Sequence, residues 1–340
     1  MKKTAVVILN WNGKKYLEMF FRTIVERTEK PGIEVIVADN GSTDDSVDWL
    51  KENFPSTRLI LFDRNYGYTG GYNKALAQIE ADYYVLLNSD VEVEDRWIDP
   101  LIDYLDAHPE CAAAMPKVRS YYNRDDFEYA GACGGYIDMF GYPFCRGRIL
   151  SSIEKDEGQY DSVQEVFWAS GVALTIRAEV YHRLGGLDDN FFAHMEEIDL
   201  CWRIKLEGYT LVVVPDAVIY HVGGGTLPNN SPRKLYLNFR NNLLMMYKNL
   251  PTFNRHIILF IRKVLDGGSA LVYLLTGNFG FFKAVFQAHM DYYKIRRKLV
   301  VAKNKPKYNK AGIYKGSIVF RFFLSRCRLK FSQLGFRLEK

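Results

Sequence analysis

The alternation of short apolar strands with helix-like segments over the first ninety residues most constrains what this chain can fold into. The apolar runs are rich in β-branched side chains, which is typical of buried strands. The predicted strands span residues 5–9, 33–38, 58–62 and 83–87, and the predicted helices span residues 14–27, 42–49 and 72–79. This order predicts an α/β fold whose sheet is largely parallel and covered by helices on both faces.

Polar residues follow these strands where a binding site is expected. Asn10, Asp39 and Asn88-Ser89-Asp90 each come directly after an apolar strand. Open α/β sheets bind ligands at the carboxyl ends of their strands. The Asp39 carboxylate could accept hydrogen bonds from a ribose or a base. The Asp90 carboxylate could hold a divalent cation whose other ligands come from substrate phosphates.

Two familiar nucleotide motifs are missing after the first strand. Leu9-Asn10-Trp11-Asn12-Gly13 contains neither GxGxxG nor GxxxxGK[ST], which argues against nicotinamide and ATP-hydrolysing enzymes. A glycine-rich segment at residues 65–73 precedes the third predicted helix instead. Its glycines would permit close approach to a phosphate or sugar, although an ordinary loop explains them as well.

The second half of the chain contains a second group of candidate residues. Glu196, Glu197 and Asp199 open a predicted helix at residues 196–207, where acids favour the helix dipole and where one could also act as a general base. His221 ends a short predicted strand, and such a histidine is often purely structural. Trp168 belongs to a predicted strand at residues 166–176 and could face a sugar or lie in the core.

The charge of the chain is unevenly distributed. The net charge is +5, but residues 287–340 contain fifteen Lys and Arg and only two acids, Asp291 and Glu339. A basic, aromatic segment of this kind indicates an anionic partner, either a membrane or a nucleic acid. The uncharged run at 267–282 is too short to span a bilayer. We therefore expect helices at 233–249 and 253–286, broken at Gly267-Gly268 and Gly277, whose basic part lies on a membrane surface or packs on the rest of the protein.

The cysteines and the N-terminus indicate the compartment. The chain has five cysteines, an odd number, and no CxxC spacing. The apolar run after Thr4 is too short for the hydrophobic region of a signal peptide. We therefore expect reduced cysteines and a cytoplasmic protein, peripheral on the inner face of the cytoplasmic membrane.

In their order these motifs resemble the family 2 glycosyltransferases with the GT-A fold. The resemblance is greatest to the rhamnosyltransferase-like and galactofuranosyltransferase-like branch. The matching segments are residues 7–12, 39–42, 65–73, 86–90, 170–171, 191–200 and 215–221. The resemblance implies a Rossmann-like GT-A catalytic domain at 1–250, with a donor half at about 1–110 and an acceptor half at about 111–250. A helical, basic, membrane-associating region at 251–340 would follow.

The same resemblance implies an activity and a set of site residues. The chain would be an inverting, metal-dependent glycosyltransferase that moves one sugar, with rhamnose as a candidate, from a nucleoside-diphosphate sugar to a glycan or lipid-linked acceptor in cell-surface polysaccharide synthesis. The donor would contact Asn10, Asn12, Asp39, Asn40, Asn65, Gly67, Gly70, Asn73, Asn88 and Ser89. Mg²⁺ or Mn²⁺ would be held by Asp90 and His221. The base would be Glu197 or Glu196, and the acceptor would contact Trp168, Ser170 and Gly171.

Departures from the family pattern refine this expectation and leave alternatives. Asn88 replaces an acid that is common in the metal motif, and the base pair reads Glu196-Glu197 where Glu-Asp is usual. No QxxRW motif is present, which favours single addition over processive synthesis. The alternatives are a nucleotidyltransferase, which should have a glycine-rich N-terminal loop with a basic residue, and a non-catalytic carbohydrate-binding or nucleic-acid-binding protein. No nucleic-acid partner is expected.

Overall fold

The computed structural model describes residues 2–223, 231–301 and 308–335. Its centre is a nine-stranded sheet whose first half is parallel, as predicted. The parallel strands of this half are β1 (Thr4–Asn10), β2 (Ile33–Asp39), β3 (Arg58–Leu61) and β4 (Tyr83–Leu87). The β-branched and leucine side chains of β1, β2 and β4 are buried because helices cover both faces of the sheet.

The second half makes the sheet mixed. Its strands are β5 (Val91–Val93), β6 (Cys111–Ser120), β11 (Gln164–Glu165), β12 (Ala173–Arg177) and β13 (Thr210–His221). Strand β12 runs antiparallel between β4 and β6, whereas β13 runs parallel to β6. The strand order is β11-β13-β6-β12-β4-β1-β2-β3, with β5 paired to β13. The antiparallel β12 brings its N-terminal end to the edge where β1, β2 and β4 end.

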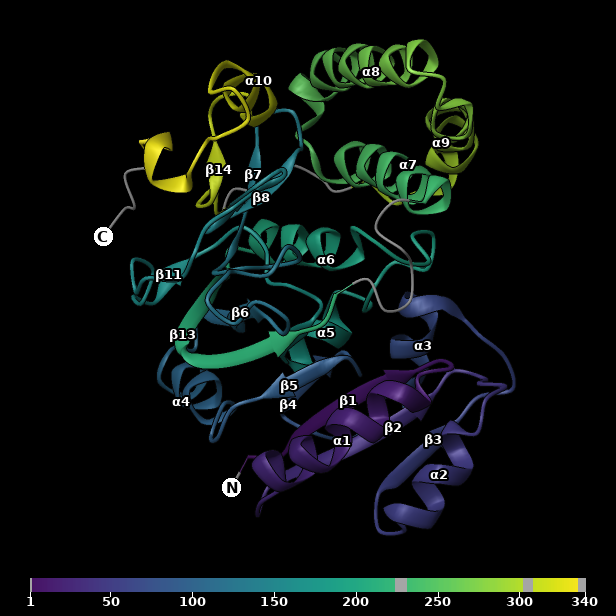
Figure 1. The fold of residues 1–340 in the computed structure, drawn as a ribbon, viewed down its shortest axis with the longest axis vertical. Helices are drawn as coiled ribbons and strands as arrows, with labels where there is room; N and C mark the ends of the chain where they lie inside the picture. The colour runs from purple at the N-terminus through teal and green to yellow at the C-terminus, as the bar shows by residue number, and fades with distance from the viewer. Residues whose placement is uncertain (1, 224–230, 302–307, 336–340) are drawn as a thin grey trace.

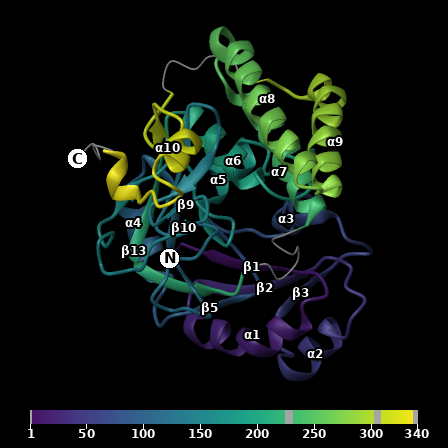
Figure 2. The ribbon, with the colours of Figure 1, turned by 45° about the horizontal axis from the view of Figure 1, so that its top comes forward.

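Helices cover both faces of this sheet (Figures 1 and 2). One face carries α1 (Lys14–Thr28), α2 (Ser46–Asn53) and α4 (Asp99–Ala107), and the other carries α3 (Gly67–Leu76), α5 (Ala178–Arg183) and α6 (Glu196–Leu206). In Figure 1 the first set lies below the sheet and the second set above it. This arrangement confirms the mixed α/β architecture expected from the sequence.

A smaller sheet links the middle of the chain to its C-terminal part. Its strands, in spatial order, are β10 (Ser152–Ile153), β9 (Arg148–Ile149), β8 (Pro143–Cys145), β7 (Gly135–Asp138) and β14 (Ile313–Tyr314). Strand β14 pairs in parallel with β7. Strand pairing therefore crosses the boundary expected at residue 250.

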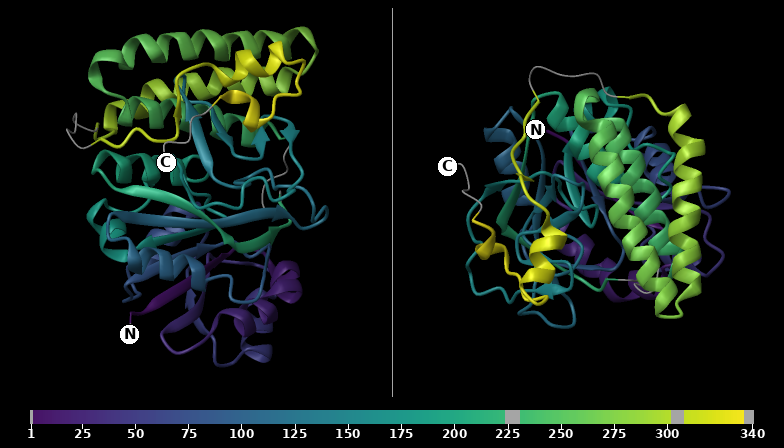
Figure 3. Two further views of the ribbon diagram at one scale, coloured as in Figure 1. Left: turned by 90° about the vertical axis from the view of Figure 1, so that its left-hand side faces the viewer. Right: turned by 90° about the horizontal axis from the view of Figure 1, so that it is seen from above.

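The remaining helices build outward from α6. These are α7 (Pro232–Asn249), α8 (Thr252–Leu275), α9 (Phe279–Ile295), the 3-10 turn η1 (Arg296–Lys298), α10 (Ile318–Leu324) and the 3-10 turn η2 (Phe331–Leu334). Helix α7 packs on α6, and α8 and α9 pack on α7, so that α8 lies at the top of the molecule in Figure 1 and at the top of the left panel of Figure 3. No helix in the described ranges is long and apolar enough to cross a membrane.

Four sequence expectations about elements are wrong. Helix α8 runs through Gly267-Gly268 without a break, and the chain turns only at Gly277, whose φ is +75°. Helix α3 begins at Gly67, so the glycine-rich segment is helical rather than a loop. The helix predicted at residues 42–49 begins only at Ser46, and the Ser42 hydroxyl instead accepts from Asn12 N and Asn10 Nδ2. The segment between β11 and β12 that contains Trp168 is not a strand.

Candidate active site

The ends of β1 and β2 carry a buried polar network. Asn10 Nδ2 donates to Asp39 Oδ2 at 2.9 Å, and Asp39 Oδ1 accepts from Ser42 N at 2.9 Å. The Asn10 Oδ1 atom is buried and has no hydrogen-bond partner. These residues are adjacent because β1 and β2 are parallel and in register at Asn10 and Asp39. The network is held rigidly and keeps one unused acceptor.

Two further asparagines of the predicted donor site organise its loops. Asn12 Oδ1 accepts from Thr43 N at 2.7 Å, which joins the loop after β1 to the loop after β2. Asn40 donates to Asn65 Oδ1 at 3.1 Å and to Gly67 O at 3.0 Å, and accepts from Tyr66 N. These contacts fix the loops at the carboxyl ends of β1 and β2, the edge of the sheet predicted to bind the donor.

The first turn of α3 is not open to a phosphate. The carbonyl of Phe192 accepts from Tyr68 N at 2.9 Å and from Thr69 N at 3.3 Å. A Cβ on Gly67, whose φ is +74°, would lie 2.5 Å from the Phe192 ring. We therefore correct the expectation that Gly67 contacts the donor, because the Phe192 ring fills the space beside it and its amide donates to Asn65 Oδ1 at 2.7 Å. The assignment of Gly70 stays a prediction.

Asn73 is similarly engaged away from a ligand. Its Nδ2 donates to Leu187 O at 2.8 Å and Asp189 Oδ1 at 2.9 Å. Its Oδ1 accepts from Tyr181 Oη at 2.6 Å and from Leu187 N at 3.0 Å. Asn73 thus fastens α3 to the segment before the acid motif, and we correct its assignment as a donor contact.

Asp90 and His221 meet through strand pairing. Strand β5 follows Asp90 and pairs with the end of β13, which places His221 Nε2 3.2 Å from Asp90 Oδ1. Burial alone would raise the pKa of Asp90, but the charge and hydrogen bond of His221 hold it below the usual value. The half-buried Asn88 and Ser89 lie on the same turn between β4 and β5.

Sequence reasoning missed a third member of this group, Glu128. Its Oε2 lies 3.4 Å from His221 Nδ1, so the imidazole stands between two carboxylates. Burial lowers the pKa of His221, but the charges of Asp90 and Glu128 outweigh it and raise that pKa to about 10. Glu128 lies in the irregular segment after β6, where the sequence has no strand or motif that could have marked it.

The described residues include no cluster of three or more His, Cys, Asp or Glu arranged to hold a metal ion by themselves. Asp90 and His221 are 7% and 5% exposed and point at each other. One carboxylate and one neutral imidazole fit a cation that takes its remaining ligands from a diphosphate. His221 would have to release a proton to bind it, because Asp90 and Glu128 raise its pKa.

The three acids of α6 have different environments. Asp199 is fully paired, with Arg203 at 2.8 Å, Lys248 at 2.9 Å and Asn249 at 2.7 Å. Glu196 Oε2 and Glu197 Oε2 are buried without a hydrogen-bond partner. Burial raises the pKa of Glu197 to about 7, and burial together with the charge of Glu197 raises the pKa of Glu196 further. Asp199 therefore anchors the helix, and the two glutamates remain chemically available.

The loop before α6 is strained and is held by α7. Phe192, His194 and Met195 have φ values of +67°, +69° and +71°, which side chains other than glycine rarely adopt. Asn241 Nδ2 donates to the carbonyls of Phe191 at 2.9 Å, Ala193 at 2.8 Å and His194 at 2.7 Å. No local sequence pattern marks Asn241, because its partners are backbone atoms almost fifty residues away.

Two of the three predicted acceptor residues are buried, and the third borders Glu197. Trp168 is 3% exposed, and its indole donates to Tyr136 O at 2.9 Å, so it is a core residue and we correct its assignment as an acceptor contact. The Ser170 hydroxyl donates to Ala130 O and is also buried. Gly171 is more open, and a Cβ there would lie 3.7 Å from the Glu197 Cβ. Of the three residues, only Gly171 borders Glu197.

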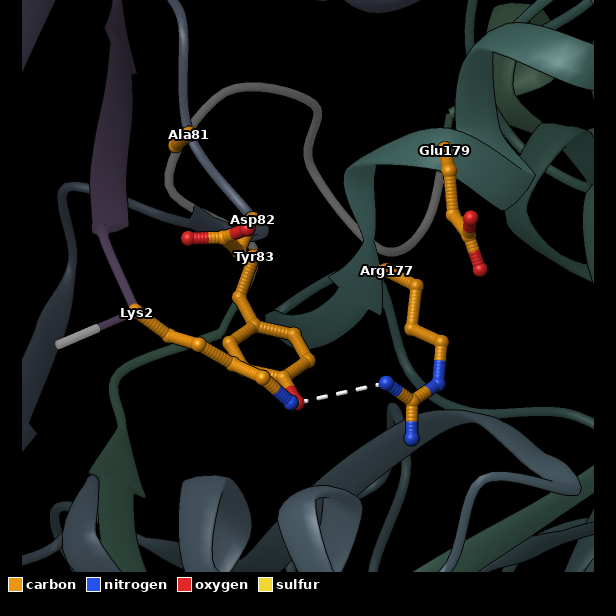
Figure 4. Close-up of a pocket in the computed structure, with 6 residues that line it drawn as sticks. All are labelled: Lys2, Ala81, Asp82, Tyr83, Arg177 and Glu179. Carbon is orange, nitrogen blue, oxygen red and sulfur yellow. Dashed lines mark hydrogen bonds between the residues drawn. The ribbon is translucent and has the colours of Figure 1, made fainter.

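A cavity of about 300 Å³ lies near the opposite edge of the sheet, beside the amino end of β4 (Figure 4). Its cations are already engaged: Lys2 Nζ donates to Asp106 at 2.6 Å and Tyr83 Oη at 2.9 Å, and Arg177 donates to Tyr83 Oη at 3.2 Å and to Cys111 O. None of the predicted site residues lines it. The polar residues at the carboxyl ends of β1, β2 and β4 are therefore the better candidate site.

Comparison with known proteins agrees with this geometry. Residues 5–153 match the family model described as glycosyl transferase family 2. Over residues 5–153 this chain therefore matches the family 2 glycosyltransferases. The enzyme is 29% identical over 234 residues to an N-acetylglucosaminyl-diphospho-decaprenol L-rhamnosyltransferase of Mycobacterium tuberculosis, with 64% of this chain and 75% of the relative covered. The rhamnosyltransferase-like branch of the resemblance is thereby supported.

Solved structures show the same fold at low identity. A mannosyltransferase of Pyrobaculum calidifontis in complex with GDP-Man and Mn²⁺ superposes with a TM-score of 0.54 at 16% identity, over 86% of this chain and 87% of that one. S. aureus TarS 1–349 in complex with UDP-GlcNAc gives a TM-score of 0.56 at 15% identity, over 88% and 84%. These likenesses confirm the GT-A fold of the glycosyltransferase.

Proposed function

We propose that this glycosyltransferase moves a single sugar, with inversion, from a nucleoside-diphosphate sugar to a glycan or lipid-linked acceptor in cell-surface polysaccharide synthesis. The observation that carries the proposal is the pair of glutamates at the start of α6, each of which has one carboxylate oxygen buried without a hydrogen-bond partner. Glu197 borders Gly171, and the next residue, Val172, accepts a hydrogen bond at 3.0 Å from the backbone of Asn88, on the turn that ends at Asp90. Rhamnose is the candidate sugar because the mycobacterial relative is named as an L-rhamnosyltransferase.

The base is assigned to Glu197. Inversion in one step requires a group that removes the proton of the acceptor hydroxyl as its oxygen attacks the anomeric carbon. Glu197 is half-buried and borders Gly171, whereas Glu196 is 5% exposed. A carboxyl with a pKa of about 7 is ionised in a useful fraction at neutral pH and still binds a proton well. Burial, together with the like charge of Glu197, raises the pKa of Glu196, which is the more deeply buried of the two.

The donor is assigned to the ends of β1, β2 and β4. The Asp39 carboxylate and the unpartnered Asn10 Oδ1 are acceptors for a base or ribose. Asp90 and His221 face the diphosphate in this assignment, and so do Asn88 and Ser89, which lie on the same turn as Asp90. A divalent cation, Mg²⁺ or Mn²⁺, held by Asp90 and His221 would supply charge stabilisation to the departing diphosphate. Glu128 would orient the His221 ring from its other nitrogen.

The positive charge of the C-terminal region indicates the kind of acceptor and the location of the enzyme. The basic C-terminal region would attract the diphosphate of a lipid-linked acceptor and the anionic headgroups of a membrane. We therefore propose a peripheral enzyme on the inner face of the cytoplasmic membrane. Residues 302–307 and 336–340 of this region lie outside the described residues.

The test is a thermal-shift screen of UDP, dTDP, GDP and CDP, each with and without Mn²⁺. A ligand that binds only the folded protein stabilises it by about 2.7 kcal/mol at a hundredfold excess over Kd. We expect one nucleotide to raise Tm in a metal-dependent manner, and we expect Asp90→Ala to abolish the metal dependence.

Glu197→Gln serves as the matched variant, because it removes the proposed base and leaves the donor side intact. It should keep the nucleotide-induced shift of Tm and lose transfer of sugar to acceptor. If no nucleotide shifts Tm in the wild type, or if Glu197→Gln transfers sugar at the wild-type rate, the assignment is wrong.

A further inference from the structure

Helix α8 buries three of its four charged side chains and exposes most of its apolar ones. Arg255, Arg262 and Asp266 are 6%, 4% and 0% exposed. On the other side of the same helix Phe253 and Phe260 are 90% and 65% exposed. This polarity is the reverse of that expected for a helix on a water-facing surface.

Specific contacts fix this orientation. Arg262 Nε donates to Asp266 Oδ1 at 2.8 Å, and the Arg262 guanidinium lies 3.7 Å from the centroid of the Tyr142 ring. Arg262 also donates to Asn242 Oδ1 on α7 and to Phe140 O. Rotating α8 to bury its apolar face would leave these buried charges without partners, which is strongly unfavourable. The apolar face is therefore held outward.

The exposed apolar face extends over two further helices. Helix α9 adds Phe279, Phe286 and Met290, and α10 adds Phe320, Phe323 and Leu324; the exposed fractions of all six are 44% or more. Helices α8 and α9 pack against each other, and α10 lies apart from them at the same end of the molecule in Figure 1 and in the right panel of Figure 3. We call the exposed apolar side chains of these three helices the apolar face. Exposed apolar side chains gathered at one end of a molecule mark a site of interaction.

The charges around the apolar face identify what covers it. Between Thr252 and Gly335 the sequence contains only two acids, Asp266 and Asp291. Asp266 is buried, and Asp291 pairs with Lys294. The basic residues of α9, α10 and the turns after them, by contrast, are numerous: Lys283, Arg296, Arg297, Lys298, Arg326, Arg328 and Lys330. A second copy would place positive charge against positive charge, whereas anionic headgroups would neutralise it.

We propose that the apolar face inserts into the headgroup–acyl boundary of an anionic bilayer, with α8 lying in the plane of the membrane. A helix with a charged face and an apolar face binds in this interfacial position rather than across the membrane. Insertion through side chains goes beyond the electrostatic attraction of the basic region, because it fixes which face of the enzyme meets the lipid.

This orientation has a consequence that rests on the proposed function. Neighbouring residues of α7 contact the buried side of α8 and the acid loop: Asn242 contacts Arg262 of α8, and Asn241 holds the loop before Glu197. Two helix layers, α7 and α8, therefore separate the glutamates from the lipid surface. An acceptor sugar carried on a membrane lipid diphosphate would have to extend past these two helices to meet Glu197.

The experiment is flotation of the full chain with phosphatidylcholine vesicles and with vesicles that also contain phosphatidylglycerol. The test variant combines Ile257→Glu with Val264→Glu, at side chains that are 63% and 58% exposed on α8. The matched control combines Met19→Glu with Leu61→Glu, which are 43% and 52% exposed on α1 and β3 at the opposite end of the molecule. Both pairs change the net charge equally.

We expect the wild type to float with phosphatidylglycerol vesicles, and we expect the α8 pair to reduce the bound fraction at least about tenfold because each glutamate must be buried in the interface. The control pair should stay within about twofold, because its charges lie beyond the range of screened attraction to the membrane. Three results would overturn the inference: no flotation of the wild type, an equal loss in both pairs, or an α8 pair that only converts a dimer to a monomer in sedimentation velocity.

Nucleotide thermal shifts on the same preparations separate this inference from the proposed function. Flotation without any nucleotide shift refutes the proposed function and supports the membrane face. A nucleotide shift without flotation refutes the membrane face and supports the donor site.

Discussion

Asn241 is expected to position Glu197, the proposed base, without touching a substrate. It is fully buried and donates to three carbonyls of the strained loop before α6. In Asn241→Ala, Phe191 O keeps the hydrogen bond from Arg240 at 2.9 Å, but Ala193 O and His194 O lose this donor. A buried acceptor without a partner costs about 1–3 kcal/mol, so we expect the free energy of unfolding to fall by about 2–4 kcal/mol.

The activity should fall by more than the stability loss explains. Three left-handed residues in this loop each carry strain of about 1–3 kcal/mol, which the loop can release once the Asn241 amide is gone. Glu197 lies two residues after Met195, the last of these three residues. A displacement of about 1 Å at a group that takes part in the reaction costs about a hundredfold in rate. We therefore expect kcat to fall about a hundredfold while KM for the donor changes little, because the donor residues lie on β1 and β2.

Asn242→Ala is the matched control for this prediction. Asn242 is equally buried and donates to Gly141 O at 2.6 Å, but it contacts α8 and the smaller sheet rather than the acid loop. Steady-state kinetics and thermal unfolding of both variants, well below their Tm, separate the two effects. A similar loss of kcat in both variants, or an unchanged kcat in Asn241→Ala, would refute the positioning role.

Three other predictions follow from the same contacts. The log of kcat/KM should rise with pH and level off above about pH 7, because Glu197 must be ionised to accept a proton. Glu197→Gln should remove the activity and also raise Tm above pH 7. The raised pKa means that the protein loses stability as this carboxyl ionises between its unfolded pKa and about pH 7, and the glutamine avoids that loss. Trp168→Ala should lower the free energy of unfolding by about 3–5 kcal/mol, whereas Trp168→Phe should keep the KM of the acceptor, which a sugar-stacking role for Trp168 would not allow. Asp199→Ala should lower the free energy of unfolding by about 3–5 kcal/mol, because it leaves Lys248 buried with only Asp188 as a partner. Urea unfolding should show a larger loss for Asp199→Ala than for Asp188→Ala.

Local patterns predicted the elements that surround the donor edge. The strands at 5–9, 33–38, 58–62 and 83–87 match β1 to β4 within one residue at each end, because continuous β-branched runs have few alternatives to a buried parallel strand. Helix α6 and its three acids were also predicted within one residue. The polar residues at Asn10, Asp39 and Asp90 could be placed on one edge because parallel strands share the direction of their carboxyl ends.

The assignment of individual site residues failed where a side chain meets a distant backbone. Asn73 and Gly67 occupy the expected segment, but residues 181–192 use the hydrogen-bonding groups of Asn73 and fill the space beside Gly67. Trp168 is in the core because its indole finds Tyr136 O. Short-range spacing carries no information about such partners, since they are set by packing between segments far apart in the chain.

By itself the sequence determined the α/β order, the carboxyl-end cluster, the acid helix and the excess of positive charge toward the C-terminus. Each of these depends on neighbouring residues or on simple sums of charge. Only the tertiary structure decided that Asp199 is an anchor and Glu197 is available, that Glu128 stands behind His221, and that α8 turns its apolar side outward. The physical reason is that partnering and burial are properties of surfaces that come together in folding, and the same amphipathic pattern fits either orientation of a helix until its buried charges find their partners.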